Sequence, residues 1–80
     1  MHAVYVLQSL KDPRRHYVGY SATDIGSRLA IHNRGEVFHT AKARPWKIVC
    51  TIQFVEQGKA LAFEKYLKSG SGRAFAKRHF

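Results

Sequence analysis

Two tyrosines near the start of the chain, Tyr5 and Tyr17, are the first residues whose type could serve a reaction. A phenol can take a proton from water when a nearby cation or metal ion lowers its pKa. Tyrosine is also common in strands for packing reasons alone. The pair therefore indicates catalysis only where charged groups converge on it.

Arg28 and His32 lie four residues apart, so they share one face of any helix that contains them. The forked guanidinium can bind two phosphate oxygens and keeps its charge, and histidine can relay a proton. The pair flanks the apolar positions Ile25 and Leu29 and could project into a cleft beside a sheet. The alternative is an ordinary solvated helix edge.

Glu64 is the acid best placed to hold a metal ion. It follows Phe63 at the edge of an apolar helical face, whereas the other four acids fall in turns, caps, loops or strand ends: Asp12, Asp24, Glu36 and Glu56. Magnesium commonly uses only one or two carboxylates, with water and substrate phosphate completing its shell. The alternative is a plain ion pair with Lys68, four residues on.

Basic residues dominate the chain. It has 80 residues, with 14 Lys and Arg against 5 Asp and Glu, and a formal net charge of +9. Such a charge indicates a polyanionic partner, and nucleic acid in particular; solubility or a ribosome-like structural role is the alternative. Phe38 and His39 could stack on an unpaired base or fold back onto the core. The candidate nucleic-acid-binding residues are Arg34, His39, Lys42, Arg44, Lys65, Lys68 and Arg73.

The length predicts one domain, residues 1–80, and excludes multi-domain enzymes, Rossmann dehydrogenases and barrels. A hydrophobic content of 45% suffices for a core. The single cysteine, Cys50, rules out an intramolecular disulfide, and no run reaches the roughly 18 apolar residues of a membrane span. Without a signal-peptide pattern, we expect a cytoplasmic protein with no membrane partner.

Hydrophobic patterning predicts a hairpin of strands over 3–7 and 16–20, a helix over 24–33 capped by Ser21, Thr23 or Asp24, and a stop at Gly35. A loop over 36–45 leads to a strand over 46–54, in which residues 46, 48, 50, 52 and 54 share one face.

A helix over 58–68, a break at 69–72 and a short basic helix from Arg73 complete the chain. The order is ββαβαα. The expected fold is therefore α/β of the α+β kind: a small three-stranded antiparallel sheet flanked by helices.

These segments together resemble the GIY-YIG nuclease domain, and in particular its small stand-alone bacterial members. Residues 4–6 (Val-Tyr-Val) stand where the family has Gly-Ile-Tyr, and 17–19 (Tyr-Val-Gly) stand for Tyr-Ile-Gly. Residues 28–33, 45–49 and 62–68 resemble the arginine helix, the entry to the third strand and the glutamate helix. The resemblance covers nearly the whole chain.

The resemblance implies hydrolysis of a phosphodiester with one divalent ion, Mg²⁺ or Mn²⁺, on Glu64. Tyr17 or Tyr5 would orient or deprotonate the attacking water, Arg28 would stabilise the phosphoryl charge and His32 would assist proton transfer. His39 lies near a position that is sometimes His in relatives. Val4 replaces the family glycine, and no Asn follows Glu64, so Ser69, Ser71 or water must substitute for it or the role is absent.

We therefore expect a metal-dependent endonuclease that acts on DNA, structure-selective or with a preference for single strands, with a protein partner possible. One alternative is a basic nucleic-acid-binding module without catalysis. The other is a small metal-independent ribonuclease that uses His and Lys. The residues alone leave open which tyrosine is the base.

Overall fold

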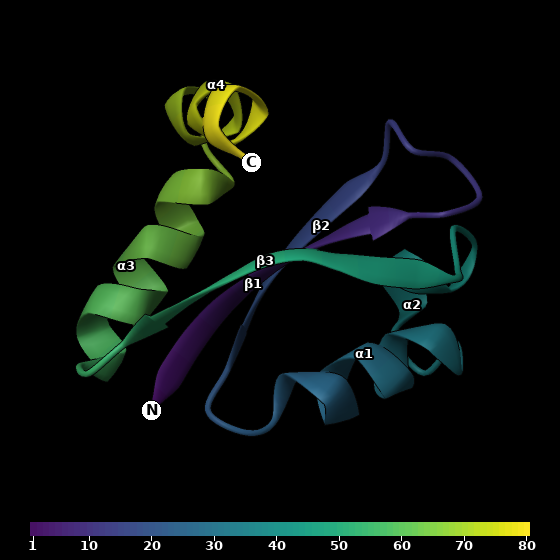
Figure 1. Ribbon diagram of the computed structural model, residues 1–80, viewed down its shortest axis with the longest axis horizontal. Coiled ribbons are helices and arrows are strands. Elements are labelled where there is room, and N and C mark those ends of the chain that lie inside the picture. Colours follow the sequence, from purple (N-terminus) through teal and green to yellow (C-terminus); the bar gives the residue numbers. More distant parts are fainter.

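An antiparallel sheet lies between two groups of helices in the computed structural model, which describes all of residues 1–80 (Figure 1). The strands are β1 (His2–Ser9), β2 (His16–Ser21) and β3 (Trp46–Phe54), in the sheet order β2-β1-β3. The helices are α1 (Ile25–Asn33), α2 (Phe38–Ala41), α3 (Gln57–Leu67) and α4 (Gly70–His79). The expected α+β fold with a three-stranded antiparallel sheet is confirmed.

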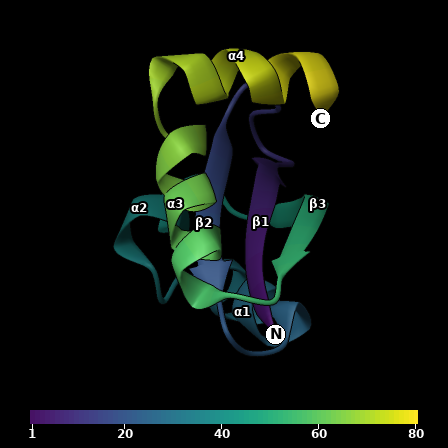
Figure 2. The same ribbon diagram turned by 90° about the vertical axis from the view of Figure 1, so that its left-hand side faces the viewer.

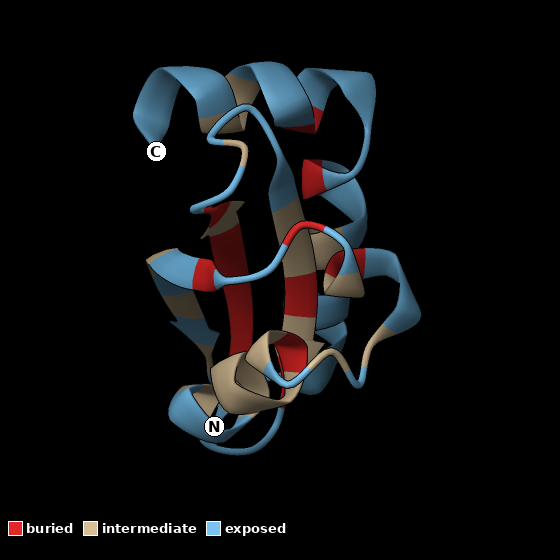
Figure 3. Cartoon of the chain, turned by 90° about the vertical axis from the view of Figure 1, so that its right-hand side faces the viewer, coloured by how far each residue is buried: buried red, intermediate tan, exposed pale blue.

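The sheet buries both of its faces, and β1 lies at its centre (Figure 2). Side chains alternate along a strand, so Val4 and Val6 pack under α3 with Ala60 and Leu67. The neighbouring positions Tyr5 and Leu7 point to the other face, where Trp46, Ala43 and residues of α1 cover them. Figure 3 shows β1 as the most continuously buried strand.

The predicted hairpin is present, and its register aligns Tyr5 with Gly19 and Leu7 with Tyr17. Tyr5 and Tyr17 are therefore diagonal neighbours on the same face, the face that α1 covers. The turn between the strands is organised by Ser9, whose Oγ accepts the backbone N–H groups of Lys11 and Asp12.

The strand β3 departs from the predicted alternation. Its pairing with β1 shifts between Val6 and Leu7, where Cys50 and Ile48 are the partners and Val49 is the extra residue. Such a bulge moves the side chains beyond it to the opposite face. Trp46 accordingly packs beside Tyr5, whereas Cys50 and Phe54 pack under α3, so the prediction of one shared face for 46–54 is wrong.

The first helix begins and ends as predicted. The Asp24 carboxylate accepts the Ser27 backbone N–H at 3.0 Å, which identifies Asp24 as the N-cap. Gly35 follows the helix with φ of 79°, a conformation that favours glycine.

Two predictions about loops are wrong. The expected loop 36–45 contains the short helix α2, so the order is ββααβαα. The segment 69–72 does interrupt the helices, but Ser69 caps α4 by accepting the Gly72 N–H, and the glycines form its first turn. A helix therefore begins at Gly70 and not at Arg73. None of the helices combines the length and apolar character that crossing a membrane requires.

Candidate active site

Tyr5 and Tyr17 are neighbours on the face of the sheet that α1 covers. Their ring centroids are 6.3 Å apart. Tyr5 is 1% exposed, whereas Tyr17, on the edge strand β2, is half-buried. Gly19 makes room for the Tyr5 ring, since a Cβ at position 19 would overlap the phenol. Tyr17 is thus the tyrosine that solvent or a substrate can reach.

His32 ties Tyr5 to the helix α2. It is completely buried; its Nε2 lies 3.1 Å from the Tyr5 hydroxyl and its Nδ1 lies 2.8 Å from Thr40 Oγ1. Because the Thr40 hydroxyl donates to the Val37 carbonyl, Oγ1 accepts from Nδ1–H, and Nε2 then accepts the Tyr5 proton. The ring of Tyr17 packs against the same imidazole, with centroids 4.7 Å apart.

Arg28 brings a positive charge to this cluster. Its guanidinium approaches the Tyr5 phenol, and its charge also acts on Tyr17 and His32. The Arg28 Nε is buried and has no hydrogen-bond partner. Buried donors are almost always paired, so we expect this atom to bind an acceptor from outside the chain, either water or a substrate oxygen.

Glu64 reaches the cluster from the other side of the sheet. Its helix α3 packs over β1 and β2, on the face opposite α1, and Glu64 acts electrostatically on both Tyr5 and Tyr17. Its side chain is 21% exposed, the lowest value among the carboxylates in ion pairs, and its Oε2 lies 3.2 Å from Lys68 Nζ. The Glu64–Lys68 ion pair, which the sequence offers as the alternative to a metal site, is therefore present at the margin of the tyrosine cluster.

Burial sets the proton affinities of the cluster. Desolvation raises the pKa of Tyr5, and the Arg28 guanidinium only partly opposes it. Desolvation and the Glu64 charge raise the pKa of Tyr17. Burial, then Arg28, lowers the pKa of His32, so that the imidazole is neutral at neutral pH. The lowered tyrosine pKa that catalysis by a phenol requires is thus absent from the domain alone.

The carboxylate of Glu64 fits a hydrated divalent ion and does not fit a closed metal cage. No group of three or more His, Cys, Asp or Glu could hold a metal. One carboxylate suits Mg²⁺ or Mn²⁺ when water and phosphate oxygens provide the other ligands. Of the serines considered as substitutes for the missing Asn, Ser69 is engaged in capping α4 and donates to the Tyr66 carbonyl.

The candidate nucleic-acid-binding residues fall into two groups, one around α1, α2 and the following loop, the other on α3 and α4. In the first group Arg34 pairs with Glu36, and Lys42 and Arg44 line an open pocket. His39 is exposed beside Phe38, a residue that is 84% exposed, so neither folds into the core. In the second group Lys65 and Arg73 are exposed, and Lys68 is held by Glu64.

Two positions escaped prediction from the sequence. Thr40 lies in a segment too short to show helical periodicity, yet it is 1% exposed and fixes the His32 ring. Asn33 joins α1 to β3 by accepting the Trp46 N–H at 2.6 Å and donating to its carbonyl at 3.2 Å. Only a tertiary structure could find both, since neither role has a local signal.

Comparison with known proteins gives the family of the chain. Residues 1–78 match the sequence model of the GIY-YIG catalytic domain. The "structure-specific endonuclease subunit SLX1" of Candida dubliniensis is 36% identical over 85 aligned positions, which cover 98% of this chain and 28% of that protein. The protein of the same name from Kluyveromyces lactis is 40% identical over 67 positions, 75% of this chain and 23% of its own length. The chain spans about a quarter of these relatives, and it belongs to the GIY-YIG family.

Proposed function

We propose that this domain is a metal-dependent endonuclease that hydrolyses phosphodiester bonds in DNA. One observation carries the proposal: two tyrosines lie between charged groups from both sides of the sheet. The buried, unpaired Nε of Arg28 belongs to α1 on one face, and the Glu64 carboxylate, on α3 at the other face, acts electrostatically on both tyrosines. A phosphate would give Arg28 the acceptor that it lacks.

Each residue of the cluster has its own task in this proposal. Arg28 binds the phosphoryl oxygens and stabilises the charge that develops there. Tyr17 contacts the attacking water, because it is half-buried and its hydroxyl takes no part in a hydrogen bond within the domain. Tyr5 and His32 act as positioning residues, since both are buried and hydrogen-bonded to each other. His32 assists proton movement only through Tyr5.

Glu64 would hold the divalent ion, Mg²⁺ or Mn²⁺, and the Lys68 ammonium would then lose part of its contact with the carboxylate. A bound divalent ion supplies Lewis-acid stabilisation of charge on the phosphate. The site otherwise contains one arginine for that task. Loss of the carboxylate should therefore be felt more strongly than loss of any other acid in the chain.

The substrate that we propose is DNA with unpaired bases next to a duplex. The curated relatives are named structure-specific endonucleases. Phe38, which is 84% exposed, supports the same preference, because exposed aromatic rings stack on unpaired bases. The relatives are also named subunits, and we propose that a partner protein contributes to substrate choice here as well.

The metal-independent ribonuclease is disfavoured, because both ring nitrogens of the buried His32 are already engaged.

The decisive experiment is a cleavage panel of single-stranded, duplex, flap and junction DNA, and RNA, with Mg²⁺, Mn²⁺ or chelator. We expect cleavage of the flap or junction DNA with metal and none with chelator or Glu64→Ala. Binding without cleavage of any substrate would instead identify a non-catalytic module. Chelator-resistant cleavage of RNA would identify the ribonuclease.

A further inference from the structure

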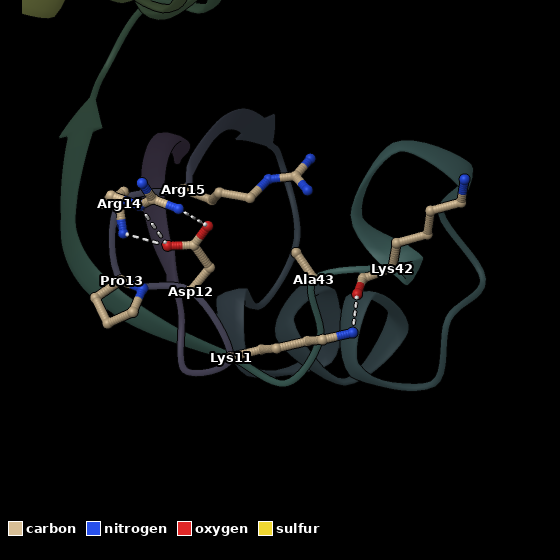
Figure 4. A pocket seen from close by; sticks show the side chains of 7 residues that line it. All are labelled: Lys11, Asp12, Pro13, Arg14, Arg15, Lys42 and Ala43. Atoms are coloured by element: carbon tan, nitrogen blue, oxygen red, sulfur yellow. Dashed lines mark hydrogen bonds and ion pairs between the residues drawn. The ribbon is translucent and has the colours of Figure 1, made fainter.

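A cationic groove lies between the β1–β2 turn and the loop after α2, apart from the tyrosine cluster (Figure 4). We call it the turn groove. It adjoins a second open pocket, and the two share Lys11 and Lys42. The residues that line them are Lys11, Asp12, Pro13, Arg14, Arg15, Ala41, Lys42, Ala43 and Arg44.

The two walls of the turn groove are joined by hydrogen bonds. The Ser9 hydroxyl donates to the Ala43 carbonyl at 2.5 Å, and this contact is buried. The Leu10 N–H donates to the Pro45 carbonyl at 2.8 Å. The Lys11 ammonium reaches across to the Lys42 carbonyl at 3.2 Å. These contacts fix the two walls relative to each other and hold the Lys11 ammonium against the Lys42 carbonyl.

The charge of the turn groove is strongly unbalanced. Its only acid, Asp12, is engaged by Arg14, whose Nε lies 3.1 Å from the carboxylate. Arg15 and Lys42 in the groove, and Arg44 in the adjoining pocket, take part in none of the ion pairs of the domain. Figure 4 shows Arg15 extending from the turn towards the loop that carries Lys42. Unpaired cations in an open groove suit a polyanion, because their charge acts on a ligand that is itself charged.

We propose that the turn groove binds the phosphodiester backbone of the nucleic acid outside the cleavage site. This inference rests on the proposed function. Arg15 immediately precedes β2 and lies two residues before Tyr17, so the groove adjoins the strand that carries the reachable tyrosine. A nucleic-acid strand anchored in the groove can continue towards Tyr17 and Arg28. Contacts to phosphate alone carry no sequence information, so the anchor sets position along the substrate.

The test compares two charge-matched double variants. Arg15→Gln/Lys42→Gln removes two charges from the turn groove, and Lys77→Gln/Arg78→Gln removes two from α4, which lies on the opposite side of the domain (Figure 1). The Kd is measured by fluorescence anisotropy of a fluorescein-labelled flap DNA, in chelator, over a range of salt concentrations. The groove variant should raise the Kd about tenfold and flatten the slope of log Kd against log salt by about 1 to 2. The α4 variant should change the Kd less than twofold.

An equal effect of the two variants, or an unchanged Kd in the groove variant, would overturn the proposal. So would a labelled polyglutamate peptide that binds the wild-type protein as tightly as the DNA does and loses as much affinity in the groove variant. If Arg15→Gln/Lys42→Gln does not fold, Arg15→Gln alone should give about half the change in slope. Because binding is measured without metal, a protein that binds in the groove but never cuts refutes only the proposed function.

Discussion

The phenol of Tyr5 lies over Gly19, its partner in the β1–β2 register, and occupies the space that a Cβ at position 19 would fill. His32 holds the hydroxyl of the same ring at 3.1 Å. The ring thus fits into the space left free at Gly19 on β2, and its hydroxyl is hydrogen-bonded to His32 on α1. Its position is fixed before any substrate binds, which is what a preorganised site requires.

Substitution of Gly19 by Ala should displace the Tyr5 ring and break its bond to His32. Overpacking of a buried site costs about 1–3 kcal/mol, so we expect a clear fall in the free energy of unfolding, measured by urea denaturation, together with lost cleavage. Gly58→Ala is the matched control, because a Cβ at that position of α3 would point into open space. It should raise helix stability by about 0.5–1 kcal/mol and keep cleavage. Equal stability of the two variants would contradict this account.

The two tyrosines should respond differently to removal of the hydroxyl. Tyr5→Phe deprives the buried His32 Nε2 of its donor, which costs about 1–3 kcal/mol of stability. Tyr17→Phe removes no hydrogen bond of the domain, so the unfolding curve should not move, whereas the cleavage rate should fall by about 10²–10⁴. Single-turnover rates and urea midpoints of both variants test the pair. A full cleavage rate for Tyr17→Phe would remove it from the reaction.

The fold could be predicted where the chain has a local signal. Alternation and turn residues identified the hairpin, and Asp24 and Gly35 marked the ends of α1. The β3 bulge escaped prediction because the alternation in 46–54 looks regular. Val49 is recognised as an extra residue only from the pairing of β3 with β1, and it moves the side chains on either side of the bulge to different faces of the sheet. The helix α2 escaped it because four residues are too few to show a period.

For the site, residue types and spacing singled out the residues that the structure brings near one another, including Arg28 and Glu64 from opposite sides of the sheet. Their burial could not be predicted. Spacing alone suggested a histidine at the margin of a cleft, whereas His32 is fully buried between Tyr5 and Thr40. That difference changes its expected task from a direct relay to the positioning of a tyrosine.

Glu64→Gln should abolish cleavage while binding of the flap DNA in chelator stays within about twofold, because the variant loses a metal ligand and gains no repulsion towards phosphate. Glu56→Gln is the control at the start of the same helix. It also breaks an ion pair, to Lys59 at 3.4 Å, but both partners are exposed. It should retain wild-type cleavage and the wild-type response to Mn²⁺ concentration. Loss of activity in both variants would point to net charge as the cause.

Arg28→Met should separate stability from activity. The Arg28 Nε is buried without a partner, so an apolar side chain of similar length removes an unsatisfied donor and should raise the free energy of unfolding by about 1 kcal/mol. The same change removes the charge that stabilises the phosphoryl group, at a cost of about 10²–10³ in cleavage rate. Urea denaturation and single-turnover cleavage measure the two effects. A destabilised Arg28→Met would mean that Arg28 serves the fold.

Protonation of His32 should destabilise the domain at mildly acidic pH. Burial and the nearby Arg28 lower its pKa in the folded state, while the unfolded chain keeps a value near 6.5. Below about pH 6.5 the unfolded state therefore binds a proton that the folded state resists, and stability is lost as the pH falls from there through the folded pKa. The urea midpoint should be constant above about pH 7 and fall as the pH drops below about 6.5. His32→Gln should start less stable but lose this fall, whereas His39→Gln, which changes an exposed ring, should keep it. Identical slopes in all three proteins would show that other groups control the acid response, and that His32 titrates in the folded state as it does in the unfolded one.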